Sequence, residues 1–154
     1  MNRFKKILLT IPVVFIGIQF IQPAQNKSAG VLTTDISKRV NIPDTVQIVL
    51  QNACYDCHSN NTIYPWYTNI QPMGWLMAWH ISQGKEALNF SEFGNYSARK
   101  KLSKLTSISN SIRDDLMPLM SYKWMHKTAR LTKGEKELID NWIQQSKDIL
   151  SAKK

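Results

Sequence analysis

The sequence predicts an all-α protein, and three observations lead to that fold class. Apolar residues recur at steps of three and four along several stretches of the 154-residue chain, which is the period of a helix with one buried face. Residues that favour helix starts and stops flank those stretches. No convincing alternation of apolar and polar residues, the pattern of a half-buried strand, is present. The length suits one domain and a short additional segment.

The first helix of the domain is expected to begin at Pro43-Asp44. Its apolar positions follow the spacing i, i+3, i+4, i+7, and they are Val46, Val49, Leu50 and Ala53. A second helix has Pro72 in its first turn, where proline is tolerated. One face of this second helix should carry Met73, Leu76, Met77 and His80.

Two further helices are expected in the C-terminal half. The third has an apolar stripe at Leu102, Leu105, Ile108, Ile112 and Leu116. It should end at Met117-Pro118, because proline cannot continue a helix. Thr132 and Glu135 form a capping-box pattern at the start of the last helix. The buried stripe of that helix is expected to comprise Leu138, Ile139, Trp142, Ile143, Ile149 and Leu150.

The N-terminus has the layout of an export segment. Residues 1–6 form a basic segment with Arg3, Lys5 and Lys6, and residues 7–21 form an uncharged apolar run. This order is the secretory pattern. The run is shorter than the roughly 20 residues that span a bilayer, yet no persuasive small-residue cleavage site follows it. Residues 1–27 are therefore expected to be a signal peptide or an uncleaved anchor, with a buried core helix as the third option. Residues 28–42 would be a tether, and 43–154 the domain.

The net charge and its distribution along the chain limit the kinds of partner that the protein could bind. The net charge is +9, but six basic residues lie beside the apolar run or at the C-terminus, which leaves fourteen basic against eleven acidic side chains in the body. That mild excess does not indicate nucleic-acid binding. A local cluster of basic residues, expected mainly as a solvated helix face, comprises Arg99, Lys100, Lys101 and Lys104.

The most specific motif is Cys54-Tyr55-Asp56-Cys57-His58. Two thiols at this spacing on a helical turn can each bond one vinyl group of the same haem, and the adjacent histidine then lies under the ring and binds iron. Both cysteines of the chain are in this motif, and an export segment precedes it. The sequence therefore predicts one covalently attached haem c per chain, with Cys54 and Cys57 as attachment points and His58 as an iron ligand.

Three alternatives remain for the cysteine pair. A structural disulfide would suit an oxidising compartment but leaves His58 unexplained. A thioredoxin-like redox pair would need a βαβ context. A zinc site would need two of the three histidines to converge on the two cysteines.

The second axial ligand of the iron is open between several residues. Met117 is favoured, because it precedes Pro118 at a helix end, in a loop that can turn its sulfur inward, and a methionine opposite histidine suits electron transfer. His80 is the next candidate, as a ligand or as a hydrogen-bond donor to a haem propionate. His126 and an open or water-bound iron are the other options, while Met73, Met77 and Met125 are expected to fill the core.

The motifs together resemble a known family. A helix leading into CxxCH, a later Met-Pro loop and a closing helix with an aromatic residue resemble class I cytochromes c. More closely, the chain resembles a small haem-binding domain family of Bacteroidetes. The matching segments are CYDCHSNNTIYPWY at 54–67, HISQGK at 80–85, NFS at 89–91 and MPL at 117–119. The resemblance implies a cytochrome c-like helical domain wrapped around haem. The insertion between CYDCH and Met117 departs from the shortest class I pattern and keeps His80 open as a ligand.

The aromatic run Tyr64-Pro65-Trp66-Tyr67 is expected to close the haem crevice, with Trp66 or Tyr67 hydrogen-bonded to a propionate. Core packing is an equal alternative for each of these aromatic residues.

These features predict a one-electron carrier tethered to the periplasmic face of the inner membrane, or released there after cleavage. It would exchange electrons with redox partner proteins rather than act as a catalyst. The alternatives are a haem enzyme or a gas or redox sensor with an open iron position, and a haem subunit of a larger respiratory complex.

Overall fold

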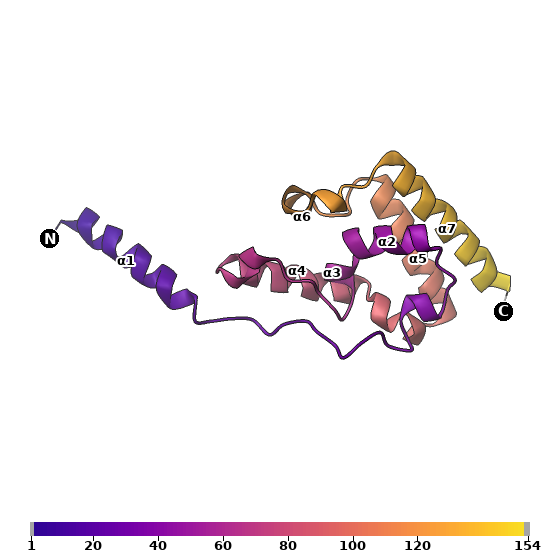
Figure 1. The fold of residues 1–154 in the computed structure, drawn as a ribbon, viewed down its shortest axis with the longest axis horizontal. Helices are drawn as coiled ribbons and strands as arrows, with labels where there is room; N and C mark the ends of the chain where they lie inside the picture. The colour runs from indigo at the N-terminus through magenta and orange to yellow at the C-terminus, as the bar shows by residue number, and fades with distance from the viewer. Residues whose placement is uncertain (1, 153–154) are drawn as a thin grey trace.

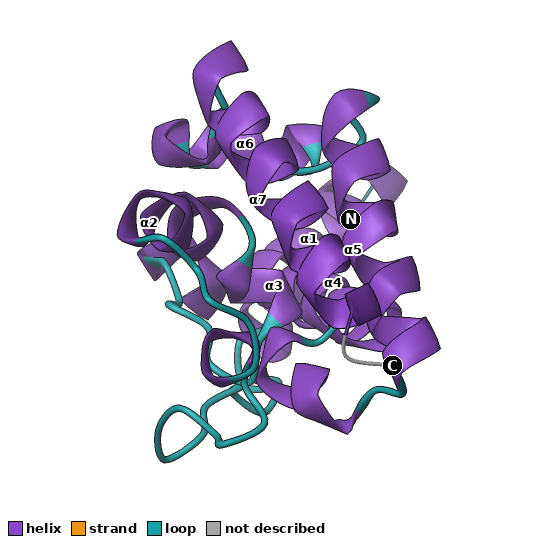
Figure 2. Ribbon diagram, turned by 90° about the vertical axis from the view of Figure 1, so that its right-hand side faces the viewer, coloured by secondary structure: helices purple, strands orange, loops and turns teal. Residues whose placement is uncertain are grey.

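The computed structural model describes residues 2–152, and within this range it contains helices and loops but no strand (Figures 1 and 2). The all-α prediction is therefore confirmed. The α-helices are α1 (Arg3–Ile18), α2 (Asp44–Ala53), α3 (Tyr55–His58), α4 (Met73–Ala87), α5 (Ala98–Arg113), α6 (Met120–Met125) and α7 (Lys133–Ala152). Short 3-10 helices lie between them at Ile36–Lys38, Trp66–Asn69, Phe90–Asn95 and Lys127–Ala129.

The hydrophobic core lies where α2, α5 and α7 pack against one another, and Figure 1 shows α5 and α7 side by side with α2 next to them. The four apolar positions predicted for α2 are all buried. From α5 and α7 the core receives Leu105, Ile108, Ile112, Ile139, Trp142 and Ile143. Trp142 also donates its indole N–H to the carbonyl of Asn41 at 3.0 Å, which fixes α7 against the start of α2.

The capping box at the start of α7 is confirmed. The Thr132 hydroxyl accepts a hydrogen bond from the Glu135 backbone N–H at 3.2 Å, and the Glu135 carboxylate accepts one from the Thr132 N–H at 2.8 Å. The predicted buried stripe was too wide, because Leu138 and Ile149 are exposed while Ile139, Trp142 and Ile143 are buried.

α5 ends earlier than expected. Its last residue is Arg113, so the prediction that the helix continues to Met117-Pro118 is wrong. Asp115 has a φ of +56°, a left-handed conformation that ends helices and that Asp tolerates better than most residues. The N–H groups of Leu116 and Met117 both donate to the carbonyl of Ser111. Leu116 is consequently exposed, not part of the buried stripe.

α3 and α4 carry the cysteine motif and the helix beside it. α4 begins directly after Pro72, as predicted, and packs against the one-turn helix α3. Gly84 is the point of closest approach, since a Cβ atom there would lie 2.5 Å from the carbonyl oxygen of Cys57. Of the expected α4 face, Met77 is buried, while Met73 and Leu76 are exposed, so the expectation that Met73 fills the core is wrong.

The N-terminal helix α1 extends away from the other helices, and none of its residues is buried (Figure 1). No helix among residues 2–152 has the length and apolar character needed to cross a membrane. Ile36 and Val40 are buried in the core, so the second half of the segment expected as a tether is packed against the domain.

Candidate functional site

Two adjoining cavities lie beside the cysteine motif. The larger has a volume of about 620 Å³ and the smaller about 140 Å³, and Cys54, His58 and Met117 line both. Side chains from α4 and α6 complete the larger cavity, while Leu88, Phe90 and residues of α5 complete the smaller one. The larger volume lies in the range of about 300–1,000 Å³ that is usual for cofactor sites, and both walls are mainly apolar.

His58 has one ring nitrogen engaged. Its Nδ1 lies 3.0 Å from the carbonyl oxygen of Leu88, so Nδ1 carries the proton and donates it to that oxygen. This tautomer leaves the Nε2 lone pair free, and such a backbone hydrogen bond is the usual support of a metal-binding imidazole. Burial lowers the pKa of His58, which favours the neutral ring that a metal requires.

The two cysteines are free thiols at the edge of the larger cavity. Burial raises the pKa of Cys54 to about 12 and that of Cys57 to about 11. Both sulfurs are therefore protonated at neutral pH in the haem-free chain. Among residues 2–152, no three His, Cys, Asp or Glu side chains converge in the manner of a metal site.

Both favoured candidates for the second axial ligand line the larger cavity. Met117 lies on the loop after α5 and borders both cavities, and it is 37% exposed. His80 comes from α4, one turn before Gly84, and borders the larger cavity; burial lowers its pKa. The structure thus brings His58, Met117 and His80 together around one space.

His126 lies elsewhere. Its ring stacks on Tyr122 with centroids 3.9 Å apart, and its Nδ1 lies 3.1 Å from the Tyr122 carbonyl oxygen. Its Nε2 faces the hydroxyl of Tyr67 at 3.4 Å. His126 is not among the residues that line either cavity beside His58.

The structure does not place the aromatic run in the wall of these cavities. The Tyr64 hydroxyl accepts a hydrogen bond from the Asn26 backbone N–H at 2.6 Å, which ties the N-terminal segment to the domain. Trp66 is exposed. Tyr67 lies behind the cavity wall, in a small space that it shares with His80 and Tyr122.

Sequence reasoning missed several cavity residues. Tyr122 lines the larger cavity and donates its hydroxyl to Asp56 Oδ2 at 2.6 Å, while Asp56 Oδ1 accepts the backbone N–H of Ile63 at 2.9 Å. These contacts fix the residue between the two cysteines, and nothing local in the sequence indicates them. Trp79 lines the larger cavity and Lys104 the smaller, where its ammonium group suits an anionic substituent. The HISQGK match could have drawn attention to Trp79, which directly precedes it.

The residues present fit a haem. A largely apolar space of cofactor size is lined by a neutral imidazole with a free Nε2, by two thiols and by further ligand candidates. The helical fold and this site together define a haem-binding α-protein.

The family comparison agrees. Residues 13–145 match the model of the haem-binding domain family, and the chain belongs to that family. Among curated proteins and among solved structures, no match was found.

Proposed function

We propose that this protein is a c-type cytochrome that carries single electrons on the periplasmic face of the inner membrane, where its N-terminal segment tethers it. The observation that carries the proposal is the convergence of Cys54, Cys57, His58 and Met117 on one cavity. Bound haem supplies a one-electron couple at its iron. The protein's own part is to hold the ring, set the iron ligands and exclude water.

Attachment would use both thiols. Cys54 and Cys57 lie on either side of Asp56, and the Tyr122 hydrogen bond to Asp56 holds this turn in place. In each attachment the S–H group would add across a vinyl double bond, with the sulfur bonding one carbon and the proton the other. One haem per chain follows from the single CxxCH motif.

The axial ligands would be His58 and Met117. The hydrogen bond from His58 Nδ1 to Leu88 sets the ring orientation and increases the basicity of Nε2. Met117 is preferred over His80 because it borders both cavities that adjoin His58, whereas His80 borders only the larger. A thioether ligand raises the reduction potential and, with both axial positions filled, favours electron transfer over ligand binding.

Covalent attachment is tested by acid–acetone extraction followed by the pyridine haemochrome spectrum. Haem should stay with the wild-type protein and should be extracted from the Cys54→Ala/Cys57→Ala variant. Complete extraction from the wild-type protein would rule out the c-type assignment while leaving haem binding intact.

The axial ligand is tested by spectra of Met117→Leu and His80→Ala, with Met120→Leu as the matched control because Met120 lines the same cavity. Only Met117→Leu should remove the sulfur-to-iron charge-transfer band and lower the reduction potential. A high-spin wild-type iron that readily binds carbon monoxide would contradict the carrier and favour a sensor or enzyme with an open position.

A further inference from the structure

Two stretches without charged residues meet in the structure. Residues 7–26 and 59–84 contain no Lys, Arg, Asp or Glu, although charged residues make up 20% of the chain. The first stretch comprises most of α1 and the segment that follows it, and the second includes most of α4. In Figure 1, the segment after α1 runs along the part of the domain that contains α4.

Hydrogen bonds hold this junction together. Gln71 is fully buried, its backbone N–H donates to Gln19 Oε1 at 2.8 Å, and its side-chain amide donates to Gln22 Oε1 at 2.9 Å. The Trp75 indole N–H donates to the carbonyl of Ile21 at 2.9 Å. The chain is therefore fixed to Gln71 and to the first turn of α4 within four residues of the end of α1, and these polar groups are bonded within the chain.

Around these hydrogen bonds lies an apolar surface, the junction patch, which consists of Phe20, Ile21, Ile70, Trp75 and Leu76. All five side chains are exposed. Gln22 also reaches the carbonyl of Asn69 at 3.3 Å, which places the segment after α1 beside Ile70. Such contiguous exposed apolar residues on a folded domain indicate an interaction surface.

We infer that the junction patch lies in the headgroup layer of the membrane, with lipid as its partner. This inference rests on the membrane tether of the proposed function. An α-helix of the 16 residues of α1 is about 24 Å long, shorter than a hydrocarbon core of about 30 Å. When the basic N-terminal end of α1 stays on the cytoplasmic side and the rest of the helix enters the bilayer, its last turn stays close to the lipid. The hydrogen bonds of Gln19 and Ile21 then bring the first turn of α4 to the same depth.

The chemistry of the patch suits that depth. Tryptophan is enriched at membrane interfaces, where the ring packs among acyl chains and its N–H needs a polar partner, here the carbonyl of Ile21. The backbone N–H and the side-chain amide of Gln71 are bonded within the chain, so they need no partner from the headgroup layer. Lys27 and Lys85 are the first charged residues after the two charge-free stretches, so no charged residue of either stretch lies within the patch.

Nitroxide labels on added cysteines in the full haem-loaded protein test this orientation. The patch positions are Ile70→Cys and Leu76→Cys, the α1 position is Ile11→Cys, and the controls Ile48→Cys and Ile149→Cys are exposed on α2 and α7. Wild-type protein without an added cysteine gives the background. The protein is placed in vesicles of phosphatidylcholine and phosphatidylglycerol, and accessibility to oxygen and to a water-soluble nickel complex gives the depth of each label.

Labels at 70 and 76 should show headgroup-level accessibility, the label at 11 should lie in lipid, and those at 48 and 149 should be aqueous. Aqueous labels at 70 and 76 with a lipid-embedded label at 11 would overturn the inference and leave the tether standing. An aqueous label at 11 would overturn the tether and the inference together. Protection of 70 and 76 only when a second protein is added would assign the patch to a protein partner instead.

Discussion

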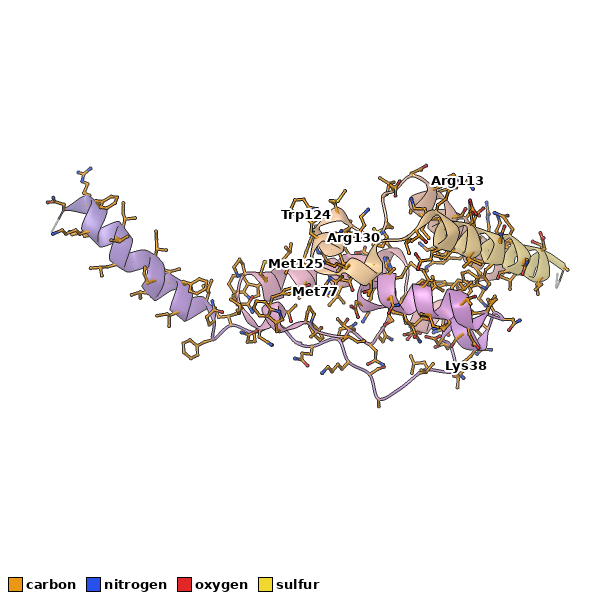
Figure 3. All side chains as sticks on the ribbon, turned by 45° about the horizontal axis from the view of Figure 1, so that its top comes forward. Lys38, Met77, Arg113, Trp124, Met125 and Arg130 are labelled. Carbon is orange, nitrogen blue, oxygen red and sulfur yellow. The ribbon has the colours of Figure 1, made fainter. Side chains whose placement is uncertain are left out.

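The two halves of the domain differ in how they bury apolar surface. Around α2, α5 and α7, the core side chains face one another and are buried by the chain alone, while Ile48, Leu138 and Ile149 lie exposed on the outer faces. Around α4 and α6, large apolar side chains stay exposed, among them Trp79, Met120 and Trp124. Figure 3 shows Trp124 and Met125 at the end of the domain where Met77 lies, away from Arg113 and Lys38.

The difference indicates that the half around α2, α5 and α7 buries its core without a ligand. The half around α4 and α6 needs haem and other partners to cover its apolar surface. Trp79 and Met120 line the larger cavity, so a cofactor held there would cover surface that the chain leaves exposed. Folding of the helical core should therefore depend little on haem, whereas order in α4 and α6 should depend on it strongly.

The largest expected effect tests the half of the domain around α2, α5 and α7, whose core the chain buries by itself. Leu50 is fully buried, and Leu50→Ala should lower the free energy of unfolding by about 2–5 kcal/mol, because it leaves a cavity in the core. The matched control is Leu138→Ala on the exposed side of α7, expected to change it by no more than about 0.5 kcal/mol. Denaturant unfolding of haem-loaded protein measures both. Equal losses for the two variants would contradict the assignment of the core.

The second prediction concerns pH and separates the haem-free from the haem-loaded chain. Burial raises the pKa of Cys54 to about 12 and of Cys57 to about 11, above the usual value of 9.0. The haem-free folded chain then retains protons that the unfolded chain loses, so the contribution of the two thiols to stability is constant below pH 9 and falls as the pH rises toward 11 and 12. A two-unit shift corresponds to about 2–3 kcal/mol.

This pH-dependent loss should be absent from haem-loaded protein, whose sulfurs no longer titrate, and from the haem-free Cys54→Ala/Cys57→Ala variant, which corrects for lysine and tyrosine titration. Urea unfolding between pH 8 and 11 measures it. An identical slope in wild-type and double-variant chains would show that the thiols are not buried in the haem-free state.

The third prediction tests the contact that joins the cysteine motif to α4. Gly84→Ala should destabilise the protein by about 1–3 kcal/mol, because the added methyl group meets the Cys57 carbonyl and backbone must move. Displacement of Cys57 should also reduce the yield of attached haem. Gly134→Ala is the matched control, since nothing lies within 4 Å of a Cβ there. Normal haem yield and stability in Gly84→Ala would show that the close contact between Gly84 and Cys57 does not position the cysteine motif.

Features that depend on residues close together in the sequence were the ones that the sequence could predict. The buried face of α2 and the cap of α7 depend on residues a few positions apart, so periodicity and capping rules were sufficient. The CxxCH motif is likewise local, and its chemistry indicated haem without a structure. The length of α5 was mispredicted because the left-handed Asp115 ends the helix before the proline does.

Contacts between distant residues could not be predicted. The Tyr122–Asp56 hydrogen bond spans 66 residues and the Gln71–Gln22 bond spans 49, and no local pattern marks either pair. Tyr64, Trp66 and Tyr67 follow CYDCH closely in sequence and were expected to close the haem crevice, but none of them lines either cavity beside His58. Proximity in sequence to CYDCH was therefore a poor guide to which residues line the cavities beside His58.

The smallest expected effect separates stability from haem chemistry. Thr132→Ala removes the hydroxyl that accepts the Glu135 N–H and should cost about 1 kcal/mol of stability. Thr132→Ser keeps that acceptor and should restore most of it. α7 packs in the hydrophobic core and contributes no residue to either cavity beside His58. The haem spectrum and reduction potential of both variants should therefore equal those of wild type. A spectral change in Thr132→Ala would mean that the two halves are coupled more tightly than their packing indicates.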